Sequence, residues 1–200
     1  MALLIKKTNE ADIHLNSSVW EGIENIPIAS VNWDIYPSYI KTDAKLIHNN
    51  EGIYVKFISD EHPVFVSHRE NNDEVYMDST VEFFICPNKN DKNHFNFEIN
   101  AEGYALAGFG IGGDRIRFYG IDFSQFKIEN NIKSDGFEVM LFVPFAFLLE
   151  HTSEISDTVR CNLYKCCEAE GHVHYLSAFP IECETPNFHV DEAFEEFILE

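Results

Sequence analysis

Hydrophobic and polar residues alternate along much of this chain, most clearly between residues 71 and 103. In residues 80–86 (TVEFFIC) and 94–100 (HFNFEIN), every second residue is a large apolar one. A period of two is typical of a β-strand that turns one face toward a core. The residues between them, 87–93, are rich in Asn, Asp and Lys, which predicts an antiparallel hairpin. Glu82, Glu98 and Asn100 would then lie together on the face turned away from the core.

Similar short segments follow at spacings of about 10 to 15 residues, separated by turn signals rich in Gly, Asn, Asp and Pro. The expected strands are residues 44–48, 52–59, 80–86, 94–100, 104–109, 115–119, 126–132, 137–142, 158–167 and 172–178. Many short strands joined by turns predict an all-β fold, an antiparallel β-sandwich of jelly-roll type. One short helix is expected at residues 144–150, because Pro144 suits a first helical turn.

The whole chain, residues 1–200, is expected to form one domain, since no repeat, linker or low-complexity tract interrupts the pattern. A hydrophobic content of 45%, with 18 Phe, provides for a substantial core. The last ten residues, DEAFEEFILE, are acidic but also apolar at Phe194, Phe197 and Ile198. We therefore expect them to dock onto the body of the protein.

Charge narrows the range of partners. The chain has 34 acidic and 14 basic side chains, a formal net charge of -20, which argues against nucleic acid and anionic membranes as partners. A neutral or cationic ligand, or a metal ion, remains compatible. No apolar run approaches the roughly 20 residues of a membrane span, and no export signal follows Met1. As written, the sequence predicts a cytoplasmic protein, or a secreted one if a leader has been lost.

The cysteines and acidic residues raise the question of a metal. Five cysteines are an odd number, and reduced thiols packed as small apolar groups are the favoured interpretation. A zinc site is the alternative, but it lacks a C-x-x-C pair; its ligands would come from Cys161, Cys166, Cys167, His172 and His174. No cofactor is required by the pattern. A structural calcium ion could take oxygen ligands from the aspartates, although no calcium-binding loop motif is present; the candidates are Asp60, Asp73, Asp78 and Asp114.

The polar face of the predicted hairpin is the main candidate for chemistry. Glu82 and Glu98 could be solvated, could accept hydrogen bonds from sugar hydroxyl groups, or could act as the two carboxylates of glycoside hydrolysis. Tyr76 lies six residues before Glu82, in a polar segment at one edge of the sheet. Its ring could stack on the apolar face of a pyranose, or could pack at a strand end.

A series of motifs resembles the carbohydrate-binding module family 9-like domains. The motifs are EVYMDSTVEFFICP, HFNFEINAEG, VRCNLYKC, HYLSAFPI and PNFHVDEAFEEFIL, in that order. The resemblance covers about residues 52–200 and implies a jelly-roll β-sandwich, often with calcium. It also implies a sugar held between two aromatic side chains, with polar groups around its hydroxyls.

Carried across to this sequence, the resemblance assigns Tyr76 to the first clamping aromatic and Phe179 to the second. Glu82 and Asn100 match hydrogen-bonding positions. The sequence departs from the family pattern because both clamp positions are usually Trp, and because Glu98 stands where a basic residue is usual. Arg117 could supply that basic group instead. The last motif also has Glu-Glu where Phe-Gly is usual.

The resulting prediction is non-catalytic binding of a mono- or oligosaccharide. An alternative is a sugar-processing enzyme that uses Glu82 and Glu98 as an acid and base pair. A third interpretation is an acidic scaffold that binds a protein partner.

Overall fold

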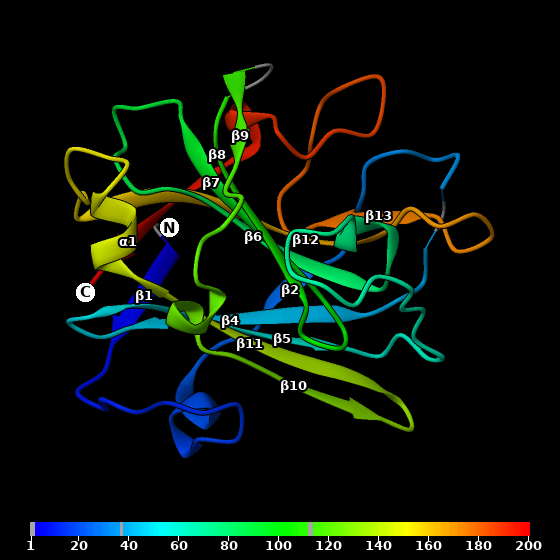
Figure 1. Cartoon of the computed structure of the whole chain (residues 1–200), viewed down its shortest axis with the longest axis horizontal. Helices are drawn as coiled ribbons and strands as arrows, with labels where there is room; N and C mark the ends of the chain where they lie inside the picture. The colour runs from blue at the N-terminus through cyan, green and yellow to red at the C-terminus, as the bar shows by residue number, and fades with distance from the viewer. Residues whose placement is uncertain (1–2, 37, 112–113) are drawn as a thin grey trace.

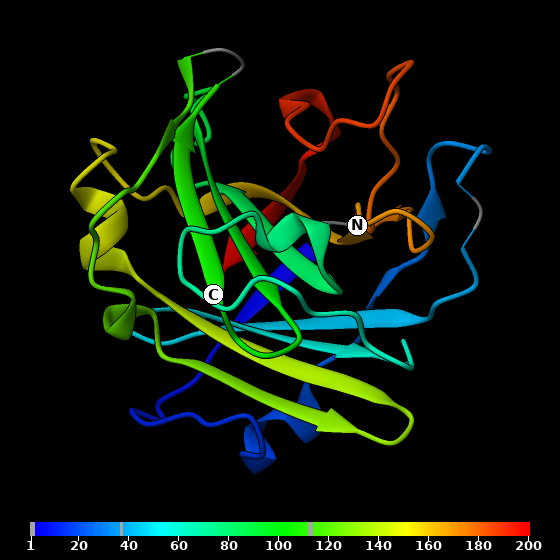
Figure 2. The same ribbon diagram turned by 45° about the vertical axis from the view of Figure 1, so that its right-hand side comes forward.

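Two layers of β-strands make up most of the molecule (Figures 1 and 2). The computed structural model describes residues 3–36, 38–111 and 114–200. The first layer consists of β10 (Ile128–Lys133), β11 (Gly136–Pro144), β5 (Gly52–Ser59), β4 (Thr42–His48) and β2 (Ile26–Ile28). The second consists of β14 (Glu195–Leu199), β12 (Thr158–Cys167), β6 (Thr80–Cys86), β7 (His94–Asn100), β8 (Ala105–Gly110) and β9 (Ile116–Arg117), with β13 (His174–Ser177) and β3 (Ser30–Val31) beside β12.

The N-terminal strand β1 (Leu3–Lys7) joins the two layers. Its first residues pair in parallel with β14, with Leu3 opposite Phe197. Its last residues pair in parallel with β4, with Lys7 opposite His48. The other strand pairings of the described chain are antiparallel, so the predicted antiparallel β-sandwich is confirmed with this one addition.

Several of the expected elements coincide with observed ones, including β5, β6, β7 and β12. The predicted helix is α1 (Phe145–Leu149), with Pro144 immediately before it. Four short 3-10 helices complete the described elements: η1 (Ser18–Gly22), η2 (Val75–Met77), η4 (Phe123–Phe126) and η5 (Asp191–Ala193). Within the part of the chain that the structure describes, no helix is long and apolar enough to cross a membrane.

The main core fills the space between the layers. Phe57 and Val139 of one layer and Phe83, Phe97 and Leu163 of the other belong to it, and all are at most 2% exposed. Burying one such side chain contributes about 1.5–3 kcal/mol. Because these residues alternate with Glu82, Phe84, Asn96 and Glu98, the pleat of β6 and β7 turns the latter to the outer face of the second layer.

That outer face is covered, which the sequence did not predict. Every residue of β6 and β7 is buried. A second apolar cluster lies there, built from residues that include Trp33, Phe84, Tyr164 and Phe188. The segment after β13, together with η2, therefore closes much of the outer face, and the polar residues of the hairpin lie beneath it.

A buried ion pair lies at one end of the sandwich. Lys165 of β12 is 0% exposed and points between the layers, where its ammonium group lies 5.8 Å from the centre of the Phe137 ring. Its Nζ atom is 2.7 Å from Oε2 of Glu61 and 2.9 Å from Nε2 of His174. Ser79 donates a hydrogen bond of 2.8 Å to the other oxygen of Glu61. This network satisfies a charge that burial would otherwise penalise.

Candidate functional site

A cavity of about 330 Å³ opens on the outer face of the second layer. Its floor comes from β6, β7 and β8, and its walls come from β9 and from a segment before η5. Figures 1 and 2 show the β8–β9 hairpin and the 180–190 segment rising from the same side of the sandwich. The lining residues are Tyr76, Glu82, Asn96, Glu98, Leu106, Gly108, Arg115, Ile116, Arg117, Glu168, Pro186, Asn187, Phe188 and His189.

Two carboxyl groups lie next to each other in the floor. Glu82 and Glu98 are directly opposite each other on β6 and β7 and are 3% and 6% exposed. Burial raises the pKa of Glu98 to about 7, against the hydrogen bond from Asn96 and the nearby Arg115 and Arg117, which lower it. Burial and the neighbouring Glu98 raise the pKa of Glu82 well above its usual value. Both groups therefore hold a proton in mildly acidic solution and can donate hydrogen bonds.

The floor also contains buried oxygen atoms that lack a hydrogen-bond partner among the described residues. They are Oε2 of Glu98 and Oδ1 of Asn96, a side chain that is only 1% exposed. The remaining polar atoms of the two side chains are hydrogen-bonded to each other: Asn96 Nδ2 donates to Glu98 Oε1 at 2.9 Å. A buried acceptor without a donor costs about 1–3 kcal/mol. Donors from a bound molecule would remove this cost.

Gly108 keeps the floor open beside Asn96. A Cβ atom at Gly108 would lie 2.7 Å from Oδ1 of Asn96 and 2.9 Å from the backbone oxygen of Ile116. Either distance is too short for a methyl group. The absence of a side chain at this position therefore leaves space next to an acceptor without a donor.

Tyr76 contributes an aromatic ring to the wall. It lies in η2, which is anchored to the end of β12 by hydrogen bonds from the amides of Glu168 and Ala169 to the carbonyls of Tyr76 and Met77, at 3.1 and 3.2 Å. Burial, assisted by the nearby Glu74, raises the pKa of the Tyr76 hydroxyl to about 12. The hydroxyl therefore stays protonated, and the ring is fixed at the cavity by the backbone of its own turn.

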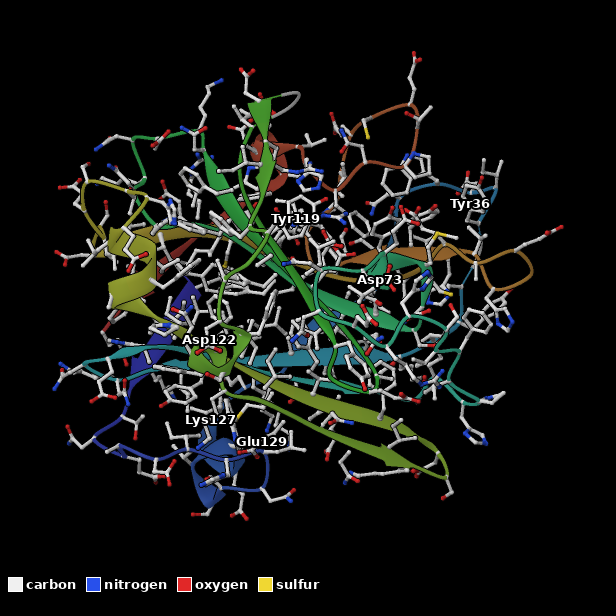
Figure 3. The ribbon with its side chains drawn as sticks, viewed as in Figure 1. Tyr36, Asp73, Tyr119, Asp122, Lys127 and Glu129 are labelled. Atoms are coloured by element: carbon white, nitrogen blue, oxygen red, sulfur yellow. The ribbon has the colours of Figure 1, made fainter. Side chains whose placement is uncertain are left out.

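Two arginines form the opposite wall. Arg115 and Arg117 lie two residues apart at the edge of the second layer, where Arg117 pairs with Gly108. Arg117 Nη1 donates a hydrogen bond of 3.2 Å to the carbonyl oxygen of Asn72. Its guanidinium carbon lies 5.8 Å from the centre of the Tyr119 ring, an exposed residue that follows β9 and is labelled in Figure 3. These contacts place two positive charges beside the two acids of the floor.

The segment before η5 closes the remaining side. Phe188 stacks on Tyr164 at 4.2 Å between ring centres, and the Tyr164 hydroxyl donates to the carbonyl oxygen of Phe188 at 3.0 Å. His189 Nδ1 lies 3.0 Å from His94 Nε2. Burial lowers the pKa of His94 to about 4 and that of His189 to about 2, so both rings are neutral. The wall is thus held by aromatic contacts and a neutral hydrogen bond.

Four of the six residues predicted to bind a ligand line this one cavity: Tyr76, Glu82, Glu98 and Arg117. The structure places the other two, Asn100 and Phe179, elsewhere. Asn96 was not among the predicted residues, although it shares a strand face with Glu98 and the alternation of β7 could have indicated it. Arg115 and the segment 186–189 have no comparable signal, because only the fold brings them to β7.

Asn100 serves the protein's own structure. It is 0% exposed, and its Nδ2 donates to the carbonyl oxygen of His68 at 2.8 Å and to Asp78 at 2.9 Å. Its Oδ1 accepts from the amides of Glu102 and Tyr104, both at 3.1 Å. Both polar atoms of the Asn100 side chain are thus hydrogen-bonded within the protein. We therefore do not include Asn100 among the residues that contact a ligand in the cavity.

Phe179 turns toward the core instead of the cavity. It packs against the main core, and its ring meets that of Phe197 edge to face at 5.9 Å. No second aromatic clamp at this position is seen; Phe188 is the other phenyl ring that lines the cavity.

Across residues 3–36, 38–111 and 114–200, no group of three or more His, Cys, Asp or Glu side chains is arranged to hold a metal ion. Cys161 belongs to the main core, whereas Cys166 donates to Glu82 at 3.0 Å on the outer face, so the zinc hypothesis fails on geometry. Asp78 accepts hydrogen bonds from Ser67, His68 and Asn100. Calcium binding stays a prediction.

A second polar cluster lies around Lys127 and Glu129, both labelled in Figure 3. His14 is 2.6 Å from Glu129 and 3.1 Å from Asp12, and Lys127 contacts the same two acids. All four side chains are at least partly exposed, and they tie the N-terminal segment to β10. This cluster therefore has a structural explanation.

Comparison with known proteins gives a consistent result. The family model described as carbohydrate-binding family 9 matches residues 16–199. No curated protein matches the chain. Among solved structures, a candidate carbohydrate-binding protein from Bacteroides uniformis has a TM-score of 0.87 at 25% identity, covering 100% of this chain and 99% of that one.

Two further similar structures are family 9 carbohydrate-binding modules from Caldicellulosiruptor kristjanssonii, both at 14% identity. One, in complex with glucose, has a TM-score of 0.70 and covers 100% of this chain and 96% of that one. The other, in complex with cellotriose, has a TM-score of 0.68 and covers 98% and 93%. At this identity the two structures support the fold.

Proposed function

This chain belongs to carbohydrate-binding family 9, and from that membership we propose that it binds a sugar, without catalysis, in the cavity between β9 and the segment 186–189. The similar modules from C. kristjanssonii were solved with glucose and cellotriose, which supports a glycan ligand. The cavity volume of about 330 Å³ lies at the small end of the range for ligand sites, which suits one or two sugar rings.

The observation that carries the proposal is the pair of buried oxygen atoms without hydrogen-bond partners, Asn96 Oδ1 and Glu98 Oε2. Sugar hydroxyl groups both donate and accept hydrogen bonds, so they would satisfy both atoms. The neutral acids of Glu82 and Glu98 can in turn donate to ring and hydroxyl oxygens. A sugar can thus both donate hydrogen bonds to the floor and accept hydrogen bonds from it.

The walls supply the apolar part of the binding energy. A pyranose has faces of C–H groups that pack well against aromatic rings. Tyr76 and Phe188 both line the cavity and are held in place by the backbone and stacking contacts described above. We assign Tyr76 and Phe188 to ring contact, and Asn96, Glu82 and Glu98 to the hydroxyls.

Isothermal titration with a panel of mono- and oligosaccharides tests the proposal. Tyr76→Ala should weaken binding about tenfold, equivalent to about 1.4 kcal/mol. Asn96→Ala should weaken binding by a similar factor, because it removes an acceptor. Tyr39→Ala is the matched control, since Tyr39 is 93% exposed and outside the cavity. Binding that Tyr76→Ala and Asn96→Ala both leave unchanged would place the sugar elsewhere.

The enzymatic alternative has less support. Glycoside hydrolysis needs one protonated and one ionised carboxyl group, which usually requires environments that separate their pKa values to either side of the working pH. Here burial raises the pKa of both Glu82 and Glu98. Turnover of aryl glycosides that Glu82→Gln abolishes, while sugar binding persists, would favour the enzyme.

A further inference from the structure

We infer that the sugar recognised by this cavity carries a carboxylate, so that its ligand class is a hexuronic acid or an oligosaccharide ending in one. This inference rests on the proposed function and narrows its ligand. It comes from the charges in the cavity walls, which a neutral sugar would leave uncompensated.

Arg115 and Arg117 are exceptional in so acidic a protein. In the described chain, no carboxylate oxygen lies within 4.0 Å of a guanidinium nitrogen of Arg115 or Arg117. The other two arginines are engaged, because Arg69 forms a two-point pair with Glu102 at 2.8 Å and Arg160 donates to backbone carbonyls of Asp91 and Asp191. With 34 acidic side chains in the sequence, two arginines without a carboxylate partner in one cavity indicate a place for an external anion.

The two side chains suit a carboxylate in shape as well as charge. A guanidinium group presents donors in a planar fork that matches the two oxygens of a carboxylate. Arg117 uses one of its terminal nitrogens on Asn72 and faces the ring of Tyr119, which fixes its direction and leaves other donors open. The side chain of Arg115 makes no hydrogen bond or ion pair with another residue of the described chain.

The acids of the floor do not cancel these charges. Several titratable groups surround Glu98. Glu82 and Cys166 lie on β6 and β12, Arg117 lies on β9 with Arg115 just before it, and Glu168 and His189 lie in the walls. Burial raises the pKa of Glu98 to about 7 and that of Glu82 well above its usual value, and burial lowers the pKa of His189, so its ring is neutral. Among the described residues that line the cavity, Glu168 is the one further acid beside the two arginines, and burial raises its pKa also. A single carboxylate suits this small positive excess better than a phosphate, whose charge approaches two.

The test compares D-glucuronate, D-glucose and D-glucose 6-phosphate by isothermal titration at about pH 6 and low salt. Glucuronate should bind about tenfold or more tightly than glucose, as a charge-assisted pair predicts. Raising the salt from about 50 to 300 mM should weaken glucuronate binding more than glucose binding. Raising the pH to about 8 should weaken it too, since Glu98 then ionises.

Variants separate the arginines from the rest of the site. Arg115→Gln and Arg117→Gln should each lower the affinity for glucuronate about tenfold more than the affinity for glucose. Arg69→Gln is the matched control and should change neither, because Arg69 pairs with Glu102 away from the cavity.

Each contrary result has a distinct meaning. Equal affinity for glucose and glucuronate would overturn the inference while leaving the proposed function standing. Tighter binding of glucose 6-phosphate would overturn the carboxylate assignment. Equal loss of glucose and glucuronate affinity in the arginine variants would show that the arginines contact ring hydroxyls, and would also overturn it. Binding of none of the three, nor of any sugar in the panel, would overturn the proposed function itself.

Discussion

Replacing Glu98 with Gln should remove a dependence of stability on pH. In the folded protein burial raises the pKa of Glu98 from 4.5 to about 7. Between pH 4.5 and about pH 7, the folded protein therefore keeps a proton on Glu98 that the unfolded chain has released. The contribution of Glu98 to stability is full below pH 4.5, is lost as the pH rises, and levels off above about pH 7.

The size of the effect follows from the shift. At 1.36 kcal/mol per pKa unit, the whole window corresponds to about 3 kcal/mol, and the part above pH 5.5 to about 2 kcal/mol. Glu98→Gln keeps the shape of the neutral acid but cannot ionise. Its free energy of unfolding, minus that of the wild type, should therefore rise by at least about 2 kcal/mol between pH 5.5 and pH 8.5, because loss of the Glu98 charge also lowers the raised pKa of Glu82.

Urea unfolding at several pH values measures this difference. The buried histidines His94, His174 and His189 have lowered pKa values, so their contribution is lost as the pH falls, but it is present in both proteins and cancels in the difference. Glu24→Gln, at an exposed position, serves as the control and should give a difference that does not vary with pH. A difference that stays constant for Glu98→Gln as well would refute the neutral, buried state of this carboxyl group.

Two further predictions concern the buried polar networks. Lys165→Met should cost about 3–5 kcal/mol in thermal unfolding because it leaves Glu61 buried without its ammonium partner, and Glu61→Gln should restore part of the loss. No loss would show that Glu61 reaches water. Asp78→Asn should cost about 2 kcal/mol and speed hydrogen exchange in residues 64–70. Burial would raise the pKa of Asp78, but hydrogen bonds from Ser67, Asn100 and His68 lower it, so the wild type alone should lose this stability as the pH falls below 3.8.

The sequence predicted the strands that are regular and face the core on one side. In β6 and β7 the alternation sets Phe83 and Phe97 against Glu82 and Glu98, and the structure has the same two sets on opposite faces. β1, β2, β3 and β14 were not predicted as strands, because they are short and have no clear alternation. Their stability comes from partners far away in the sequence, as the pairing of Leu3 with Phe197 shows.

The floor of the cavity could be predicted, and its cover could not. Alternation tells which side of a strand a residue occupies, and this placed Glu82 and Glu98 correctly. It cannot tell what lies above that side. Asn100 has the same parity as Glu98, yet the residues around Asp78 fold over it and leave no space for a ligand.

The strands β6 and β7 carry the floor of the cavity on one face and the main core on the other, and this limits how such a domain can change its preference among glycans. A change in the register of β7 that moved Glu98 would also move Phe97. The floor is therefore as rigid as the interior, and a ligand can bind with little rearrangement of the floor. The two walls are anchored to the interior at single residues, Phe118 and Phe188, while Arg115, Ile116 and Asn187 beside them are exposed. Selection for a new specificity, in nature or in the laboratory, should therefore act on those two walls while the floor stays constant.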